Sequence, residues 1–172
     1  VVVAFKILPE SILNIPQKGA VNLHASLLPR FRGAAPINHA IMNGETKTGV
    51  TTFQIRKSVD TGDILLQDII ALNNSITAGE VYNELAQTGA ALLVKTMDGL
   101  DHGSISPRKQ SDETATLAPK ISVDDCRINW NNPSKIIHNQ IRAFSPKPGA
   151  FTYFKGKRVK LLDSKELKNK QK

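Results

Sequence analysis

Three polar side chains have the types needed to stabilise an oxyanion and move a proton: Asn22, His24 and Asp60. Asn22 and His24 stand two residues apart, so on a strand both project from the same face. The amide donates to a developing oxyanion, the imidazole moves a proton near neutral pH, and a neighbouring carboxylate orients the imidazole. The pattern alone does not decide whether these three residues form a functional site. A His at the end of a strand is more often structural, and Asp-Thr-Gly more often forms a turn.

Short strands must position these side chains. The apolar run 1–5 predicts a strand buried on both faces, as in a parallel sheet, and 19–26 predicts a second strand that ends with the polar pair. The stretches 48–55 and 63–70 predict two more strands, joined by a turn-forming segment that carries Asp60. Sites of open α/β sheets lie outside the carboxyl ends of strands, where we expect these side chains to meet.

Helices are predicted between and after the strands. The stretch 8–16 predicts a short helix, and 35–45 predicts a helix with a Pro near its start and a Gly just past its end. The clearest helix begins at Thr77 and Glu80, which have capping-box spacing, and is expected to end before Gly99.

The last third of the chain is expected to form a linker followed by a smaller, mostly β domain. A polar segment without sustained periodicity predicts a linker, and after it 126–130 predicts a short strand, 134–144 a helix and 149–163 a hairpin that turns at Lys155-Gly156. We therefore expect an α/β fold class in three parts. These are the second half of an open Rossmann-like domain (1–105), a linker (106–121) and the start of a small β-rich, OB-like domain (122–172).

The net charge of +8 lies in the last third of the chain. From Val1 to Pro119 there are 10 Lys and Arg against 11 Asp and Glu, and from Lys120 to Lys172 there are 13 against 4. A near-neutral body with a basic end favours a polyanionic partner, although for the Lys-rich residues 165–172 taken alone solubility is the favoured explanation. The lone Cys126 offers no disulfide framework or thiolate metal site, and no apolar run approaches the roughly 20 residues of a membrane span.

The stretch NLHASLLPRFRGAAPI, followed later by DTGD, resembles the folate-dependent formyltransferases. The resemblance implies 10-formyltetrahydrofolate as the formyl donor and no metal. The catalytic Asn, His and Asp of the family fall on Asn22, His24 and Asp60. Its folate-contacting Ser-Leu-Leu-Pro falls on Ser26, Leu27, Leu28 and Pro29.

The continuation RFRGAAPINHAIMNGETKTGVTTF, and later TLAPKIS and IRAFSPKPGAFTYFKGKRVKL, is similar to the branch of this family that formylates methionyl-tRNA. The resemblance implies formyl transfer to the α-amino group of methionine on initiator tRNA, for translation initiation. The basic excess after Lys120 agrees with an RNA substrate. The candidate tRNA contacts are Arg30, Arg32, Lys155, Lys157, Arg158 and Lys160, with solvation of the turn an equal reading for the two arginines.

Other readings remain open at this point. Formyltransferases that act on amino-sugar nucleotides share much of the layout, and those acting on glycinamide ribonucleotide share its Ser-Leu-Leu-Pro core. A formyltetrahydrofolate hydrolase would use the same three polar residues with water in place of an amine. An inactive remnant that binds RNA is the alternative without catalysis.

Complete members of the family have further elements before residues 1–5 and after the hairpin. We therefore expect a piece that lacks the first half of the catalytic domain and most of the C-terminal domain. With an open sheet edge and an incomplete pocket, such a piece is expected to be inactive on its own. For the complete protein we expect a monomer in the bacterial cytoplasm, and a mitochondrial matrix protein without its transit peptide fits the sequence too.

Overall fold

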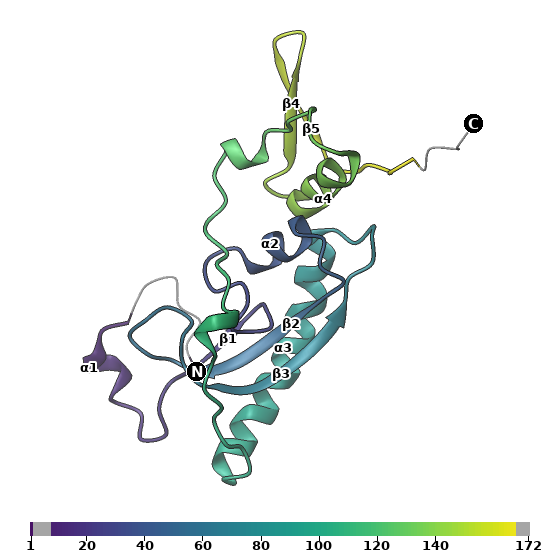
Figure 1. The fold of residues 1–172 in the computed structure, drawn as a ribbon. Coiled ribbons are helices and arrows are strands. Elements are labelled where there is room, and N and C mark those ends of the chain that lie inside the picture. Colours follow the sequence, from purple (N-terminus) through teal and green to yellow (C-terminus); the bar gives the residue numbers. More distant parts are fainter. Residues whose placement is uncertain (2–7, 168–172) are drawn as a thin grey trace.

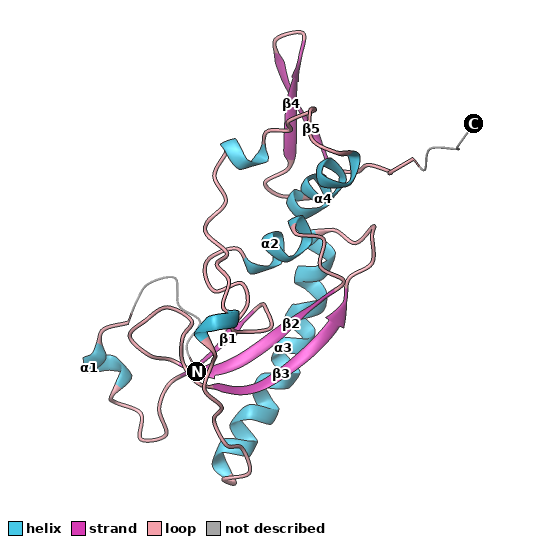
Figure 2. Ribbon diagram, viewed as in Figure 1, coloured by secondary structure: helices cyan, strands magenta, loops and turns pink. Residues whose placement is uncertain are grey.

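A computed structural model describes Val1 and residues 8–167 of the 172-residue chain. The helices and strands are α1 (Glu10–Leu13), β1 (Val21–His24), α2 (Pro36–Met42), β2 (Lys47–Gln54), β3 (Ile64–Ala71), α3 (Ala78–Asp101), α4 (Ser134–Phe144), β4 (Ala150–Phe154) and β5 (Lys157–Leu161), with short 3-10 turns η1 (Asp112–Thr114) and η2 (Asp124–Cys126). The mixed α/β character is confirmed, and Figure 2 shows how helices and strands alternate. The strand expected at 1–5 lies, beyond Val1, outside the described residues.

The strands β1, β2 and β3 form one sheet in that order, and both pairs are antiparallel. His24 lies opposite Thr51, and Val21 lies opposite Gln54. The parallel pattern was expected of residues 1–5, and the three described strands pair antiparallel. As a consequence, the loop after β2 starts beside the beginning of β1, about 10 Å from His24 along the strand. That loop must fold back to bring Asp60 to His24.

Helix α3 covers one face of β2 and β3 (Figure 1). Its buried positions recur every three or four residues, and Gly89 is among them because a Cβ there would lie 2.6 Å from Leu23 Cδ2. The helix runs past Gly99 and ends at Asp101, and the positive φ that follows its end, 68°, is at Gly103. Gly99 instead serves packing, because a Cβ there would lie 2.3 Å from Ile105 Cδ1. No helix within the described residues is long and apolar enough to cross a membrane.

Helix α4 packs against α2, so two segments about 100 residues apart in the sequence are in contact. Arg142 of α4 is buried, and its guanidinium donates to Asn139 Oδ1 at 3.0 Å and to the carbonyl oxygens of Asn73 and Ile76, each at 3.3 Å. Burial lowers the pKa of Arg142 from its ordinary value. These hydrogen bonds join the C-terminal elements to the connection between β3 and α3.

The hairpin of β4 and β5 forms as expected, since Lys155 and Gly156 both take positive φ values of 48° and 74°, as a two-residue hairpin turn requires. The prediction of a strand at 126–130 is wrong. This stretch begins in η2 and contributes an isolated bridge between Arg127 and Phe151. Its apolar residues serve the core through Cys126 and Ile128 rather than through a sheet ladder.

The cap of α3 yields a pH-dependent prediction. Hydrogen bonds from the side chain and backbone of Thr77 lower the pKa of Glu80 from 4.5. A lowered carboxylate pKa stabilises the fold above the unfolded value, and that stabilisation is lost as pH falls through the folded value. We expect Glu80→Gln to lower the free energy of unfolding by about 0.3–1 kcal/mol at pH 7. In urea titrations the difference should shrink toward about pH 3.

Glu84→Gln, at an exposed position of the same helix, is the matched control and should leave stability nearly unchanged at both pH values. An equal loss for Glu80→Gln at pH 7 and at about pH 3 would contradict the ionised capping box.

Candidate active site

His24 lies at the end of β1 and is 7% exposed. Its Nε2 is 2.8 Å from the carbonyl oxygen of Phe31, and because a carbonyl only accepts, Nε2 carries the proton of this hydrogen bond. The ring packs edge-on against Phe53. The imidazole is therefore fixed on two sides, and Nδ1 is the nitrogen that faces the Asp60 loop.

Asp60 lies in the turn between β2 and β3, where its φ of 53° is in the left-handed region. Its Oδ2 accepts a hydrogen bond of 2.8 Å from the Gly33 amide and lies 3.6 Å from His24 Nδ1. The second distance is longer than a hydrogen bond and places the carboxylate where it faces Nδ1 of the imidazole. The structure thus brings together the imidazole and the carboxylate that the sequence separates by a strand and a loop.

Asn22 is half-buried on β1, two residues before His24. Its Oδ1 accepts a hydrogen bond of 2.7 Å from the amide of Leu23. With the oxygen occupied in this way, Nδ2 is the atom left to donate. The alternation along β1 puts this donor on the strand face that carries His24.

The loop Ser26–Pro29 is held against the sheet by hydrogen bonds. Thr51 of β2 donates its hydroxyl to the Ser26 carbonyl at 2.6 Å and accepts from the Leu28 amide at 3.1 Å. Gln67 of β3 donates to the Leu28 carbonyl at 3.0 Å. The loop therefore keeps a defined shape beside His24.

Two of the four residues expected to contact folate are turned inward. Ser26 is fully buried and donates its hydroxyl to the Arg30 carbonyl at 2.6 Å, and Leu28 is buried in a small apolar cluster. Leu27 and Pro29 keep partly exposed side chains. Of the four, these two are the apolar side chains that a ligand can reach.

The two arginines after this loop have different surroundings. Arg30 is exposed and pairs with Glu45, with one nitrogen–oxygen distance of 3.1 Å. The side chain of Arg32 is 11% exposed and donates to Gln110 Oε1 at 3.0 Å and to Asp112 Oδ1 at 2.8 Å. The expectation that Arg32 contacts tRNA phosphate does not fit this burial, because its guanidinium is already bound to the segment before η2.

The four basic residues expected to contact tRNA lie on the turn and second strand of the β4–β5 hairpin, which projects away from β1, the strand that ends at His24 (Figure 1). The Arg158 guanidinium stacks 3.6 Å from the centre of the Phe151 ring. Lys160 Nζ donates to the Pro148 carbonyl at 2.7 Å, and Lys155 and Lys157 are exposed near the turn. The structure therefore separates these cations from Asn22, His24 and Asp60.

The polar segment after α3 also contributes to the site, which sequence reasoning missed. Its Gln110 donates to the Asp60 carbonyl at 2.9 Å, and its Thr116 hydroxyl accepts from the Phe31 amide at 2.9 Å. Because these contacts join residues 50 and 85 positions apart, no local spacing or periodicity marks them.

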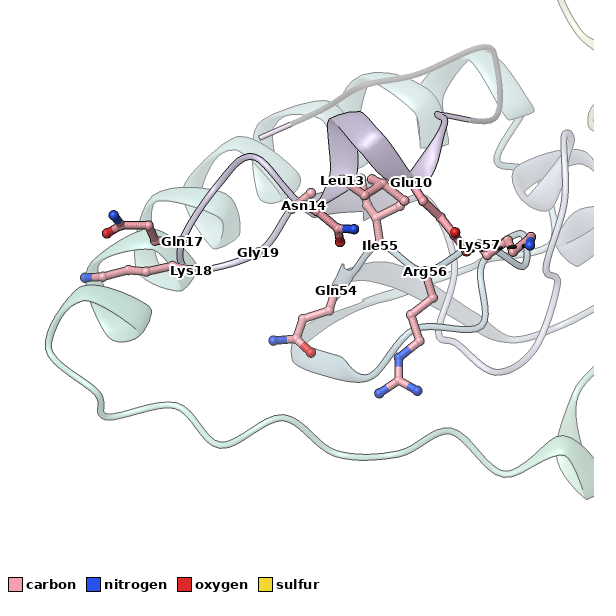
Figure 3. Close-up of a pocket in the computed structure, with 11 residues that line it drawn as sticks. Glu10, Leu13, Asn14, Gln17, Lys18, Gly19, Gln54, Ile55, Arg56 and Lys57 are labelled. Carbon is pink, nitrogen blue, oxygen red and sulfur yellow. Dashed lines mark ion pairs between the residues drawn. The ribbon is translucent and has the colours of Figure 1, made fainter.

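A separate cavity of about 680 Å³ lies between α1 and the end of β2 (Figure 3). Its lining is mainly polar, and an ion pair of 3.6 Å joins Glu10 to Lys57 at its edge. It includes none of the three residues chosen for chemistry. We therefore locate the candidate site at the end of β1 and not in this cavity.

Comparison with known families agrees with the residues found here. The family model described as "Formyl transferase" matches residues 1–97, and the one described as "Formyl transferase, C-terminal domain" matches residues 120–172. The chain belongs to the formyl transferase family. Both the candidate site and the Arg32 loop lie within the first matched range.

Among curated members of the formyl transferase family, Methionyl-tRNA formyltransferase of Clostridium tetani is 46% identical over 172 residues, which cover 99% of this chain and 56% of that protein. The enzyme of the same name from Moorella thermoacetica is 48% identical over 167 residues, covering 96% of this chain and 53% of that protein. The chain thus spans about half the length of the curated relatives it matches.

Among solved structures, an N-formyltransferase from Helicobacter canadensis in complex with folinic acid and dTDP-3-aminofucose is 31% identical. The match has a TM-score of 0.67 and covers 72% of this chain and 46% of that one. The likeness supports the formyl transferase fold for the part of this chain that the match covers.

Gly33 provides a test of how tightly the site loop is packed. Its φ is 126°, and a Cβ there would lie 2.6 Å from the carbonyl oxygen of Ala118. Gly103 also has a positive φ, 68°, but a Cβ there meets nothing within 4 Å. We expect Gly103→Ala to cost about 1 kcal/mol of stability. Gly33→Ala should cost about twice that or more, because the backbone must also move away from Ala118.

Urea unfolding of both variants measures the difference. Equal losses at the two glycines would show that Gly33 is needed only for its backbone conformation, and would contradict the close packing of the loop on Ala118.

Proposed function

We propose that this chain is part of an enzyme that transfers a formyl group from 10-formyltetrahydrofolate to the α-amino group of methionine on initiator tRNA, for translation initiation. The observation that carries the proposal is the buried His24 beside the Asp60 carboxylate, at 3.6 Å, next to the Asn22 amide on one strand. The curated relatives named Methionyl-tRNA formyltransferase, at 46% and 48% identity, support the choice of acceptor.

The reaction needs an oxyanion donor, because attack of the amine on the formyl carbon creates a tetrahedral centre with a negatively charged oxygen. We assign that donor role to Asn22, whose Oδ1 is bound to the Leu23 amide and whose Nδ2 remains to donate. No covalent bond to the protein forms in this scheme.

A proton must leave the attacking amine and another must reach the departing nitrogen, so the number of protons is unchanged. The hydrogen bond from His24 Nε2 to Phe31 leaves Nδ1 as the nitrogen that takes the proton, directly or through water. The Asp60 carboxylate stabilises the imidazolium that forms. In its charged form the ring then has an acceptor on each side.

The formyl donor supplies the electrophilic carbon and a nitrogen leaving group. We place it against Leu27 and Pro29, which are the partly exposed apolar side chains of the loop beside His24. Ser26 and Leu28 contribute by fixing the shape of that loop through Arg30, Thr51 and Gln67 rather than by presenting their side chains.

We propose that 1–105 completes a Rossmann-like catalytic domain, that 106–121 connects it to the second domain, and that 122–172 opens an OB-like tRNA-binding domain. The exposed cations of the hairpin support the last assignment, since phosphate contacts supply the sequence-independent part of RNA binding. Lys155, Lys157, Arg158 and Lys160 are the proposed contacts. The bacterial origin of the relatives supports a bacterial cytoplasmic enzyme, and we propose that it acts as a monomer.

A second acceptor has specific support. The Helicobacter canadensis N-formyltransferase at 31% identity was solved with dTDP-3-aminofucose, which makes an amino-sugar nucleotide the alternative substrate class. That match covers 72% of this chain, whereas the Clostridium tetani enzyme covers 99%. We therefore rank the tRNA acceptor first.

Removing the proposed oxyanion donor or proton carrier should abolish most turnover. In the full-length gene product we expect Asn22→Ala and His24→Ala each to reduce kcat by about 10²- to 10³-fold. The assay follows formyl-methionyl-tRNA produced from 10-formyltetrahydrofolate and methionine-charged initiator tRNA. Thermal unfolding of both variants should change little, which separates a chemical defect from loss of the fold.

Turnover near that of the wild type in either variant would contradict the site assignment. A wild-type protein that ignores methionyl-tRNA but formylates an amino-sugar nucleotide, and loses that activity in His24→Ala, would keep the site and change the acceptor.

A further inference from the structure

The segment between α3 and η2 is bound to the site loops at two places. Arg108 exchanges both backbone hydrogen bonds with Ile64, each 2.8 Å long. Farther along, the amide of Arg32 donates to the Thr116 carbonyl at 2.9 Å, and the amide of Ala118 donates to the Arg32 carbonyl at 2.7 Å. Figure 1 shows the segment passing beside β1 on its way from α3 to η2. The residues between these two anchors therefore have a fixed place against the Asp60 turn.

Gln110 lies between the anchors and binds the turn with its side-chain amide. Its Nε2 donates to the Asp60 carbonyl at 2.9 Å and to the Gly62 carbonyl at 2.7 Å. Asp60 holds a left-handed conformation, with a φ of 53°, that a non-glycine residue keeps only when its surroundings enforce it. One amide group thus fixes the peptide carbonyls on both sides of Thr61.

Arg32 determines which way this amide points. Its Nε donates to Gln110 Oε1 at 3.0 Å, so the oxygen of the amide is engaged and the nitrogen must face the turn. Arg32 is in turn held by Asp112 at 2.8 Å and is 11% exposed. Gln110 is therefore oriented by a buried partner and not by solvent.

The Asp60 turn is also packed against the end of β2, the strand that precedes it. A Cβ at Gly62 would lie 1.5 Å from the Gln54 carbonyl oxygen, so the backbone of the turn already touches β2. With the turn held by this contact and by Gln110, the Asp60 side chain faces Gly33 and His24. Its Oδ2 meets the Gly33 amide at 2.8 Å and His24 Nδ1 at 3.6 Å.

We infer that Gln110 is a positioning residue of the active site: it touches no reacting group and acts by holding the Asp60 turn so that the carboxylate faces His24. The inference rests on the proposed formyl transfer, because it deepens the role given there to Asp60. The segment after α3 is accordingly part of the site, and not only a connection between domains.

Two variants at Gln110 separate positioning from packing. Gln110→Glu keeps the length and the acceptor for Arg32 but has no donor for the carbonyls of Asp60 and Gly62. Gln110→Met keeps the length and removes both functions. In the full-length gene product we expect each to lower kcat about 10- to 100-fold, since small misplacements of catalytic groups have effects of that size. KM for the folate donor and for methionyl-tRNA should change less than about threefold.

Glu113→Gln, at an exposed position of the same segment, is the matched control and should keep kcat at the wild-type level. A readout that does not depend on activity is hydrogen exchange at the Gly33 amide, whose acceptor is Asp60 Oδ2. Exchange should become faster in both Gln110 variants and stay unchanged in Glu113→Gln.

Unchanged exchange at Gly33, or an unchanged kcat, in Gln110→Glu would overturn the inference, because that variant keeps the acceptor for Arg32 and loses the donors to the turn. An increase in KM with kcat preserved would also overturn it, by showing a substrate contact. If the wild type transfers no formyl group to methionyl-tRNA while exchange at Gly33 responds to Gln110, the proposed function fails and the positioning role stands.

Discussion

The candidate site depends on the hydrogen bond from the Gly33 amide to Asp60 Oδ2. In the antiparallel sheet, the loop after β2 leaves beside the start of β1, whereas His24 is at its end. The Asp60 carboxylate reaches the His24 imidazole only because its loop folds back and is hydrogen-bonded to the loop after β1. Residue 33 must be a glycine to make that contact. Its φ of 126° disfavours a side chain, and its approach to Ala118 leaves no room for one.

The site is built mainly from backbone groups that bind side chains. The Phe31 carbonyl holds His24, the Gly33 amide holds Asp60, and the Leu28 backbone is held by Thr51 and Gln67. Backbone groups in packed loops have few positions available, so they fix polar side chains at a low cost in conformational entropy. A buried imidazole kept in one orientation is the condition that proton transfer by His24 requires.

The two matched regions of the chain are joined by more than the segment between them. Helix α4 packs on α2, and the buried Arg142 bonds to carbonyls of the connection between β3 and α3. The loop that carries Arg32 is bound to the segment before η2. The basic hairpin and the candidate site therefore belong to one connected framework.

Local sequence determined most of the helices and strands and several of their ends. The capping box at Thr77 begins α3, and Lys155-Gly156 forms the turn of the hairpin. Caps and tight turns can be predicted because they depend on neighbouring residues alone. The residue types of the candidate site were also readable, through their resemblance to a family. Tertiary structure alone decided that β1 to β3 pair antiparallel and that residues 126–130 form no strand. It also decided that Gln110 supports Asp60, 50 residues away, since contacts between segments so distant in sequence impose no spacing that a sequence can display.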